Sequence, residues 1–271
     1  MKISVPVTMK DRIICSGGDG TFNESMRGNF KREKRLVLAH IPIGTTNDVG
    51  KMFGYGKNVI KNLKLLMEGE TRKVDICTLN NEPFVYVAGF GKYINISYET
   101  SSTSKKRLGY LAYIFNAVKE SFSFTRMHDL TFIIDGEEYN GLYSMMIIAN
   151  ATRIAGFGNI FENVKLNDDQ FEILLSNIKS KKEILRTLNY LRKTSITHVP
   201  GFYPYKARSL KVKVNDDKNI PWCVDGEKLN IDSKEVEIKI DKNVTLMLPK
   251  TNFEELFLDE NELKNKNKKR K

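Results

Sequence analysis

Two stretches near the start of the chain share one pattern, an apolar strand that ends at glycine and leads directly into a helix. The first is DRIICSGG (11–18), after which Thr21 and Glu24 match a T-x-x-E capping box. The second is RLVLAHIPIG (35–44), which is followed by a helical pattern near 57–68. Strand, glycine loop and helix in repeated order predict a parallel sheet with crossover helices.

Beyond residue 69 the chain changes to short strand-like runs separated by turns. These runs are KVDICTLN, PFVYVAGFG, LTFIID, YSMMIIAN, FEILLSN, SLKVKVN, EVEIKID and VTLMLP, interrupted by helical patterns at about 105–122 and 181–193. Many short strands with turns between them predict a mostly antiparallel β domain. We therefore expect an α/β domain over 1–73, a β domain over 74–248, and a C-terminal segment with a basic tail over 249–271.

Positive charge is concentrated at the C-terminus. The formal net charge is +11, and six basic residues lie among the last eight, namely Lys264, Lys266, Lys268, Lys269, Arg270 and Lys271. We expect this tail to be disordered, either solvated without a partner or attracted to anionic lipid headgroups or nucleic acid. The sequence contains no recognised nucleic-acid-binding motif.

The chain has no apolar run of 18 residues or more, and its first residues show no long apolar stretch with a cleavage site. These features argue against a membrane-spanning helix and a secretory signal. Cys15, Cys77 and Cys223 are far apart in the sequence, as expected in a reducing compartment. We therefore expect a cytoplasmic protein.

Both glycine loops have the composition of phosphate-binding sites. GGDGTFNE begins at Gly17, and its glycines would let backbone N–H groups and a helix N-terminus approach an anion. Asp19 would repel phosphate unless a divalent metal lay between them, which favours Mg²⁺. IPIGTTNDVGK (41–51) repeats the pattern and would meet the first loop at the carboxyl edge of the sheet. Each loop alone could equally be a tight turn.

The two loops together resemble the catalytic domain of the soluble bacterial diacylglycerol kinases. The resemblance continues through RKVDI (72–76), LGYLAYIFNAV (108–118), ANATRIAGFGN (149–159), VKLNDDQFEILL (164–175) and WCVDGEKLN (222–230). It implies an incomplete Rossmann-like nucleotide-binding domain of the NAD-kinase and diacylglycerol-kinase type, followed by an antiparallel β-sandwich. It also implies a Mg²⁺- and ATP-dependent lipid kinase.

The resemblance assigns roles to individual residues. The ATP phosphates would be lined by Gly17, Gly18, Asp19, Gly20, Thr21, Phe22, Asn23, Gly44 and Thr45. An acidic, water-linked network around the catalytic Mg²⁺ would contain Asp19, Asp48 and Asp75. A second, structural Mg²⁺ would be held by Asp168 and the backbone oxygens of Lys165 and Gln170. Asn167 and Asp169 depart from the family's Asp and Gly at this turn, and an ordinary turn without metal is the alternative.

The family's general base is the glutamate of an Asp-Gly-Glu turn. This sequence has two such turns, ending at Glu137 and Glu227, and their composition alone does not separate them because both read as hairpins. The late position of the second turn matches the family, so the resemblance implies Glu227. The basic start of the 105–122 helix, Lys105, Lys106 and Arg107, would touch lipid headgroups, or would simply be a solvated helix end.

The family normally has a strand, an N-P-x-S-G loop and a further strand before its GGDGT motif. Here 16 residues precede Gly17, so we expect an N-terminally truncated nucleotide-binding domain with an open sheet edge, which would favour a homodimer.

Three functions remain open at this point. The first is an active kinase that phosphorylates the free hydroxyl of diacylglycerol, or a related lipid, at the inner face of the membrane. The second is a non-catalytic remnant that binds lipid or protein, and the third is a nucleic-acid-binding module.

Overall fold

The computed structural model describes residues 2–3, 12–91, 126–154, 157–158, 161–180, 182–183, 186, 198–217, 220–250 and 254–268. The helix expected at 105–122, with Lys105, Lys106 and Arg107, lies outside these residues, as does most of the one expected at 181–193. Within the described part of the chain, no helix has the length and apolar character needed to cross a bilayer.

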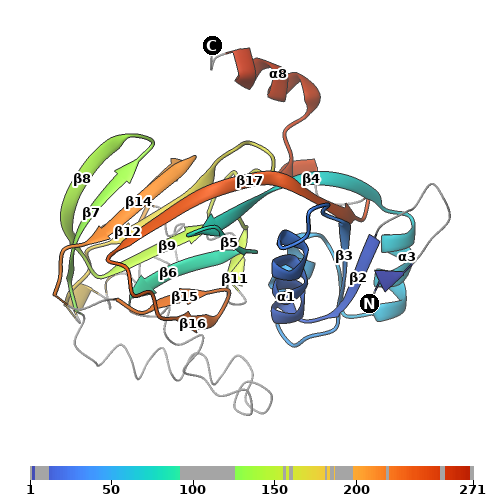
Figure 1. Ribbon diagram of the computed structural model, residues 1–271, viewed down its shortest axis with the longest axis horizontal. Coiled ribbons are helices and arrows are strands. Elements are labelled where there is room, and N and C mark those ends of the chain that lie inside the picture. Colours follow the sequence, from blue (N-terminus) through green and yellow to red (C-terminus); the bar gives the residue numbers. More distant parts are fainter. Residues whose placement is uncertain are drawn as a thin grey trace.

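The first lobe is the expected parallel α/β unit (Figure 1). β2 (Arg12–Gly17) and β3 (Val37–Pro42) pair in parallel from Arg12↔Val37 to Gly17↔Pro42. The connecting helices are α1 (Asp19–Phe30), α2 (Asp48–Met52) and α3 (Val59–Met67). β1 (Lys2–Ile3) pairs with only the first two residues of β2, so the rest of this edge has no neighbouring strand among the described residues.

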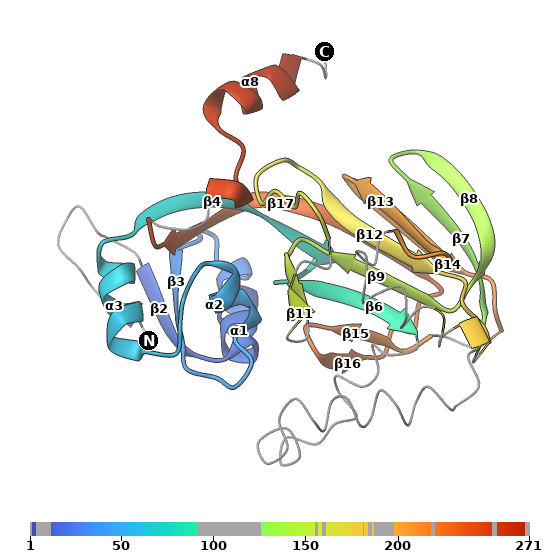
Figure 2. The ribbon, with the colours of Figure 1, turned by 180° about the vertical axis from the view of Figure 1, so that it is seen from behind.

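The second lobe consists of two stacked sheets (Figure 2). Strands of one sheet form the order β13-β12-β9-β6-β15-β16, and the opposing strands include β14, β7 and β8. All of these neighbours are antiparallel, and this confirms the expected β-sandwich. The bounds are β5 (Glu82–Phe84), β6 (Val87–Gly91), β7 (His128–Ile134), β8 (Glu137–Tyr143), β9 (Met145–Ala149), β12 (Phe171–Ser176), β13 (Phe202–Ala207), β14 (Ser209–Val214), β15 (Trp222–Val224) and β16 (Glu227–Leu229), with a small separate pair β10 (Arg153–Ile154) and β11 (Phe157–Gly158).

Two long strands join the lobes (Figure 1). β4 (Glu70–Leu79) and β17 (Glu235–Leu248) run antiparallel to each other along their length, with an irregularity between Asp241 and Val244. The first part of β17 pairs with β14 in the sandwich, and its end pairs in parallel with β3 through Leu246↔Leu38. A single nine-stranded sheet therefore spans both lobes.

One hydrophobic core is centred on the α/β unit and extends to adjoining strands of the sandwich, and a second core lies within the sandwich. In the α/β unit Phe22, Met26 and Leu38 are almost fully buried, and in the sandwich Phe132 and Trp222 are. Fully burying one such side chain contributes about 1.5–3 kcal/mol.

The helix ends differ from the sequence prediction. The capping box expected at Thr21 and Glu24 is wrong, because α1 begins at Asp19 with Gly18 as its N-cap and no side-chain cap bond. A reciprocal capping box instead begins the C-terminal helix α8 (Glu260–Lys268), where Glu262 N donates to Asp259 Oδ1 and Asp259 N donates to Glu262 Oε2. The prediction of a disordered basic tail is therefore wrong as far as Lys268.

Candidate active site

The two glycine loops touch each other at the carboxyl ends of β2 and β3. A Cβ atom on Gly44 would lie 2.5 Å from the Cα of Gly18, so this approach requires glycine. Ile43 N also donates to Gly17 O at 2.9 Å. Gly20, Thr21, Gly44 and Thr45 are exposed beside this contact. The structure thus brings together the two loops that the sequence predicted to meet.

Asp19 connects the loops through its carboxylate. Its two oxygens accept hydrogen bonds from the backbone N–H groups of Asp48 and Val49, each at 3.0 Å, at the start of α2. Burial raises the pKa of Asp19. Asp19 therefore caps the helix of the second loop, a structural role that its position in the first loop did not reveal.

The second loop is closed by Asn47. Gly44 N donates to Asn47 Oδ1 at 2.8 Å, and Asn47 Nδ2 donates to Gly44 O at 2.7 Å. Asn47 adopts a positive φ of 51°, which asparagine tolerates better than most residues. Its amide is thus engaged within the loop, while the exposed Thr45 and Thr46 remain accessible to a ligand.

Two residues expected to line the nucleotide are buried instead. Phe22 is 1% exposed and stacks on the ring of His40 at 4.8 Å between centroids. His40 Nε2, on β3, lies 3.1 Å from Gly17 O, and this contact holds the first loop against β3. Asn23 is also buried. Phe22 and Asn23 therefore hold the loop in place, and only their backbone could face a ligand.

The three expected metal-site carboxylates occupy different environments. Asp48 is buried, with Oδ1 3.8 Å from Nε of Arg153, a residue that the sequence analysis did not single out. Asp75 Oδ2 accepts a hydrogen bond from Asp169 N at 2.7 Å. Burial, together with the charges of Asp169 and Asp168, raises the pKa of Asp75 to about 6.

A small cavity of about 10 Å³ lies between the loops and Asp75. It is lined by Phe22 and Val49 on one side and by Asp75 and Asn150 on the other, and it has roughly the volume that one water needs. Among the described residues, no three acidic, histidine or cysteine side chains converge to hold a metal directly. Mg²⁺ commonly uses one or two carboxylates together with water and phosphate oxygens, so these donors fit a water-linked site that is completed by a nucleotide.

The second Asp-Gly-Glu turn is anchored by its aspartate. Asp225 is buried and accepts hydrogen bonds from the backbone N–H groups of Val85, Tyr86 and Val87 at 2.7, 3.0 and 3.1 Å. Burial raises the pKa of Asp225 to about 6. Glu227 itself is exposed at the start of β16. Asp225 therefore positions Glu227, a role that the Asp-Gly-Glu pattern alone does not show.

Tyr86 connects this turn with the glycine loops. Its backbone N–H donates to Asp225 Oδ1 at 3.0 Å, and burial raises the pKa of its hydroxyl well above the usual value. Tyr86 follows β5, which packs on α1. The Glu227 turn and the two loops therefore share one region of the molecule.

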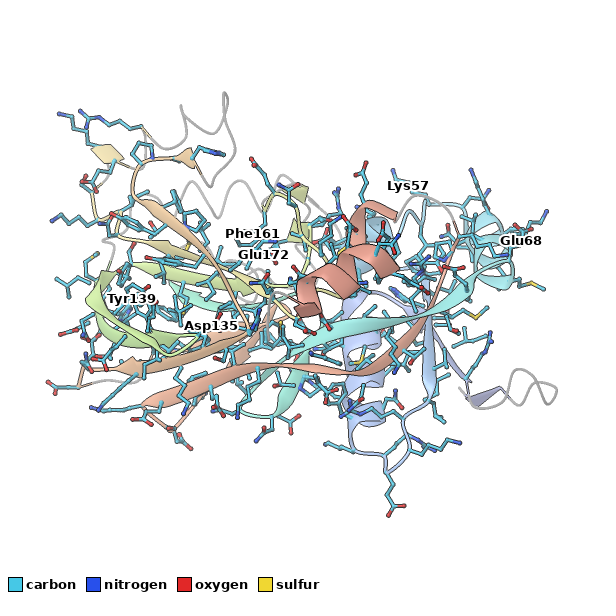
Figure 3. All side chains as sticks on the ribbon, turned by 90° about the horizontal axis from the view of Figure 1, so that it is seen from above. Lys57, Glu68, Asp135, Tyr139, Phe161 and Glu172 are labelled. Atoms are coloured by element: carbon cyan, nitrogen blue, oxygen red, sulfur yellow. The ribbon has the colours of Figure 1, made fainter. Side chains whose placement is uncertain are left out.

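The first Asp-Gly-Glu turn serves the sandwich. Asp135 Oδ1 accepts hydrogen bonds from the backbone N–H groups of Arg208 and Ser209, which join β13 to β14, and Figure 3 shows Asp135 within the sandwich lobe. Glu137 lies on β8, at the edge of its sheet. The two turns therefore have different neighbours in the fold, a difference that their sequences do not show.

The third set of expected site residues forms a turn before β12. Asp168 is buried, its Oδ1 accepts a hydrogen bond from Gln170 N at 3.1 Å, and its Oδ2 lies 3.0 Å from Nζ of Lys266 on α8. The Lys165 side chain reaches the C-terminal segment, where its Nζ donates to Glu255 O at 2.6 Å.

Beside this turn, Glu172 gives the protein a testable pH dependence. Glu172 is buried 3.1 Å from Nζ of Lys206, and burial raises its pKa to about 7. A carboxyl whose folded pKa lies above its unfolded value binds its proton more tightly in the folded protein. We therefore expect the thermal midpoint to rise as the pH falls from about 8 to about 6.5, which differential scanning fluorimetry would measure.

The Glu172→Gln variant should flatten the profile in that interval, while Glu68→Gln, an exposed substitution on the other lobe, should leave it unchanged (Figure 3). As the pH falls through about 6.5, the usual value for histidine, the buried His40 and His128 oppose the trend, because burial lowers their pKa. A wild-type midpoint that stays level or falls on acidification from about pH 8 would contradict this assignment.

Comparisons with known proteins find related sequences over most of the chain. A family profile described as diacylglycerol kinase catalytic domain matches residues 4–79, and one described as YegS C-terminal NAD kinase beta sandwich-like domain matches residues 87–242. A protein named diacylglycerol kinase from Bacillus subtilis (strain 168) is 26% identical over 247 residues, covering 91% of this chain and 80% of that protein. A diacylglycerol kinase from Staphylococcus aureus (strain JH9) is 29% identical over 217 residues, covering 80% and 68%.

The fold is similar to that of a solved structure. A crystal structure of a diacylglycerol kinase from Bacillus anthracis str. Sterne has a TM-score of 0.69 and 23% sequence identity, covering 89% of this chain and 78% of that one. The same two-lobed architecture is thus present in both.

Proposed function

Because the chain belongs to the diacylglycerol kinase family of lipid kinases, we propose that it transfers the γ-phosphoryl group of ATP to the free hydroxyl of diacylglycerol. The product would be phosphatidic acid. In this reaction a bond forms between the lipid oxygen and the γ-phosphorus, the bond from that phosphorus to the β–γ bridging oxygen breaks, and ADP leaves.

The observation that carries the proposal is the contact between the two glycine loops. Gly18 and Gly44 meet without side chains, and the first turn of α1 begins at this point with no side-chain cap. Uncapped backbone N–H groups and the helix dipole favour an anion there. Gly17 to Thr21 on one side and Gly44 and Thr45 on the other would hold the ATP phosphates.

The acidic groups beside the loops suit the charge of a nucleotide that carries Mg²⁺. Asp19 lies half-buried at the loop contact, and Asp48 and Asp75 lie behind it, facing Arg153 and the Asp169 backbone respectively. Mg²⁺, when bound with ATP, would neutralise phosphate charge. Asp19 would orient that cation from the loop, and Asp48 and Asp75 would act through water.

Glu227 would take the proton from the lipid hydroxyl. Its exposure leaves the carboxylate accessible to a substrate, and Asp225 fixes the turn that carries it through three backbone hydrogen bonds. A general base must reach the proton that it removes, and a rigid turn limits the positions that it can take. Diacylglycerol resides in a bilayer, so the protein would act as a peripheral enzyme at the inner membrane face.

The test is transfer of labelled phosphate from γ-labelled ATP to lipids in mixed micelles with Mg²⁺. The acceptors would be diacylglycerol, monoacylglycerol, ceramide and phosphatidylglycerol, with the lipid-free micelle as the blank. We expect label in phosphatidic acid at a rate above that of the other acceptors. Transfer to another lipid alone would keep the kinase and change the substrate. No transfer by folded protein would favour the non-catalytic binding module.

A further inference from the structure

The C-terminal segment is fastened to the turn that precedes β12. The 3₁₀ turn η3 (Glu254–Leu256) begins this segment, and Leu166 N donates to Leu256 O at 2.7 Å. The Asn167 side chain makes two hydrogen bonds to the backbone of Leu258, at 2.8 and 3.0 Å. Leu256 and Phe257 are buried in the core of the α/β unit. The segment is therefore an integral part of the fold.

Lys266 completes this attachment from α8. Its ammonium group donates to Asp168 Oδ2 at 3.0 Å and to the side-chain Oε1 of Gln170 at 2.9 Å. The Lys266 side chain is 25% exposed and that of Asp168 only 7%. In Figure 3, α8 crosses the middle of the molecule on the side nearest the viewer. The cation is thus largely removed from water and lies on the residues for which the family resemblance implies a divalent metal.

The donor set does not fit a divalent metal in this arrangement. Mg²⁺ requires near-octahedral oxygen ligands at about 2.0–2.1 Å, whereas Asp168, the one side chain expected to bind the metal, directs Oδ2 at the Lys266 ammonium group and accepts a hydrogen bond from Gln170 N at Oδ1. The neighbouring Asp169 is paired with Nζ of Lys242 at 2.5 Å. Lys206 lies beside Glu172 in the same way. The acidic groups around this turn are therefore balanced by lysines of the chain itself.

We propose that the Lys266 ammonium group is the resident cation of the 165–170 turn, where it replaces a divalent metal and fixes α8 to the body of the protein. The ammonium group balances the negative charge of Asp168. The Lys266 side chain is largely buried where it crosses the turn. Because Asp169 N donates to Asp75 Oδ2, the same turn also supports Asp75. The stability of this turn is thus independent of metal.

The test is thermal unfolding without nucleotide, in excess EDTA and in millimolar Mg²⁺ at equal ionic strength. We expect the wild-type midpoint to be the same in both. The Lys266→Met variant keeps the length of the side chain but not its charge, and in EDTA its midpoint should fall by about 3–6 °C, because it leaves a largely buried carboxylate without this partner. The matched control, Lys57→Met at an exposed site on the other lobe, should match the wild type.

A second measurement tests whether a metal binds at the turn. The number of bound Mn²⁺ ions is counted by electron paramagnetic resonance in the absence of nucleotide. The wild type and Asp168→Asn should bind equal amounts. A wild-type protein that gains stability from Mg²⁺ and binds a Mn²⁺ ion that Asp168→Asn loses would overturn the proposal. It would also be overturned by a Lys266→Met variant as stable as the wild type in EDTA. Neither readout depends on kinase activity.

Discussion

The Glu227→Gln variant should transfer phosphate to lipid with a kcat lower by about 10²–10⁴-fold, the usual contribution of a positioned general base. Glutamine keeps the size of the side chain and its hydrogen-bonding capacity but cannot accept the proton of the hydroxyl. Glu227 is exposed, so the thermal midpoint should not change. The measurement is labelled-phosphate transfer at saturating ATP, with unfolding recorded on the same preparations.

The chain supplies its own control for this substitution. Glu137 ends the other Asp-Gly-Glu turn, is exposed like Glu227, and lies on β8 in the sandwich. Glu137→Gln should leave kcat and stability unchanged. If both variants kept the wild-type kcat, neither glutamate would be the base. If Glu137→Gln alone abolished transfer, the assignment between the two turns would be reversed.

The Asp19→Asn variant should lose about 10²–10³-fold in kcat/KM, the range seen when one preorganised electrostatic contact is removed from a transition state. Asparagine retains one oxygen, so one of the two backbone bonds to α2 can remain. The loss of stability should therefore be modest, about 1 kcal/mol, as for a weakened helix cap. The measurement is kcat/KM for ATP at saturating lipid and Mg²⁺, with Asp217→Asn, an exposed substitution, as the control.

The loss of kcat/KM compared with the loss of stability separates the two roles of Asp19, as a helix cap and as a charge that acts on the nucleotide. A structural cap alone would lower stability and leave kcat/KM nearly unchanged in the protein that stays folded. A charge that acts on the nucleotide would lower kcat/KM far more than the thermal midpoint. An unchanged kcat/KM with a normal midpoint would show that Asp19 contributes to neither.

Most of the architecture could be predicted from hydrophobic patterning. The strands that end at Gly17 and near Gly44, the parallel pairing of β2 with β3 and the antiparallel β lobe all follow from buried runs and turn residues. The return of β17 to pair with β3 was not foreseen, because a run such as VTLMLP shows that a strand is buried and not which strand lies beside it.

Local sequence patterns predicted the wrong ends for two helices. Thr21 and Glu24 satisfy the capping-box pattern with Thr21 as the N-cap, yet the N-cap of α1 lies three residues earlier, because the glycine loop turns directly into the helix at Gly18. The C-terminal lysines follow the composition of a disordered tail, yet α8 forms there. Asp259 and Glu262 begin this helix and Lys266 attaches it to Asp168, and that partner is 98 residues away in the chain.

The sequence by itself determined the residues available for chemistry. It specified two glycine loops at strand ends, an aspartate in the first loop and two Asp-Gly-Glu turns, because spacing and residue type are local properties of the chain. The tertiary structure alone decided which of them meet. It placed Gly18 against Gly44, directed Asp19 to α2, anchored the Glu227 turn through Asp225, and placed an ammonium group where a metal was expected. The physical reason is that each of these contacts joins residues far apart in sequence, and their partners are selected by packing and charge balance in the folded protein.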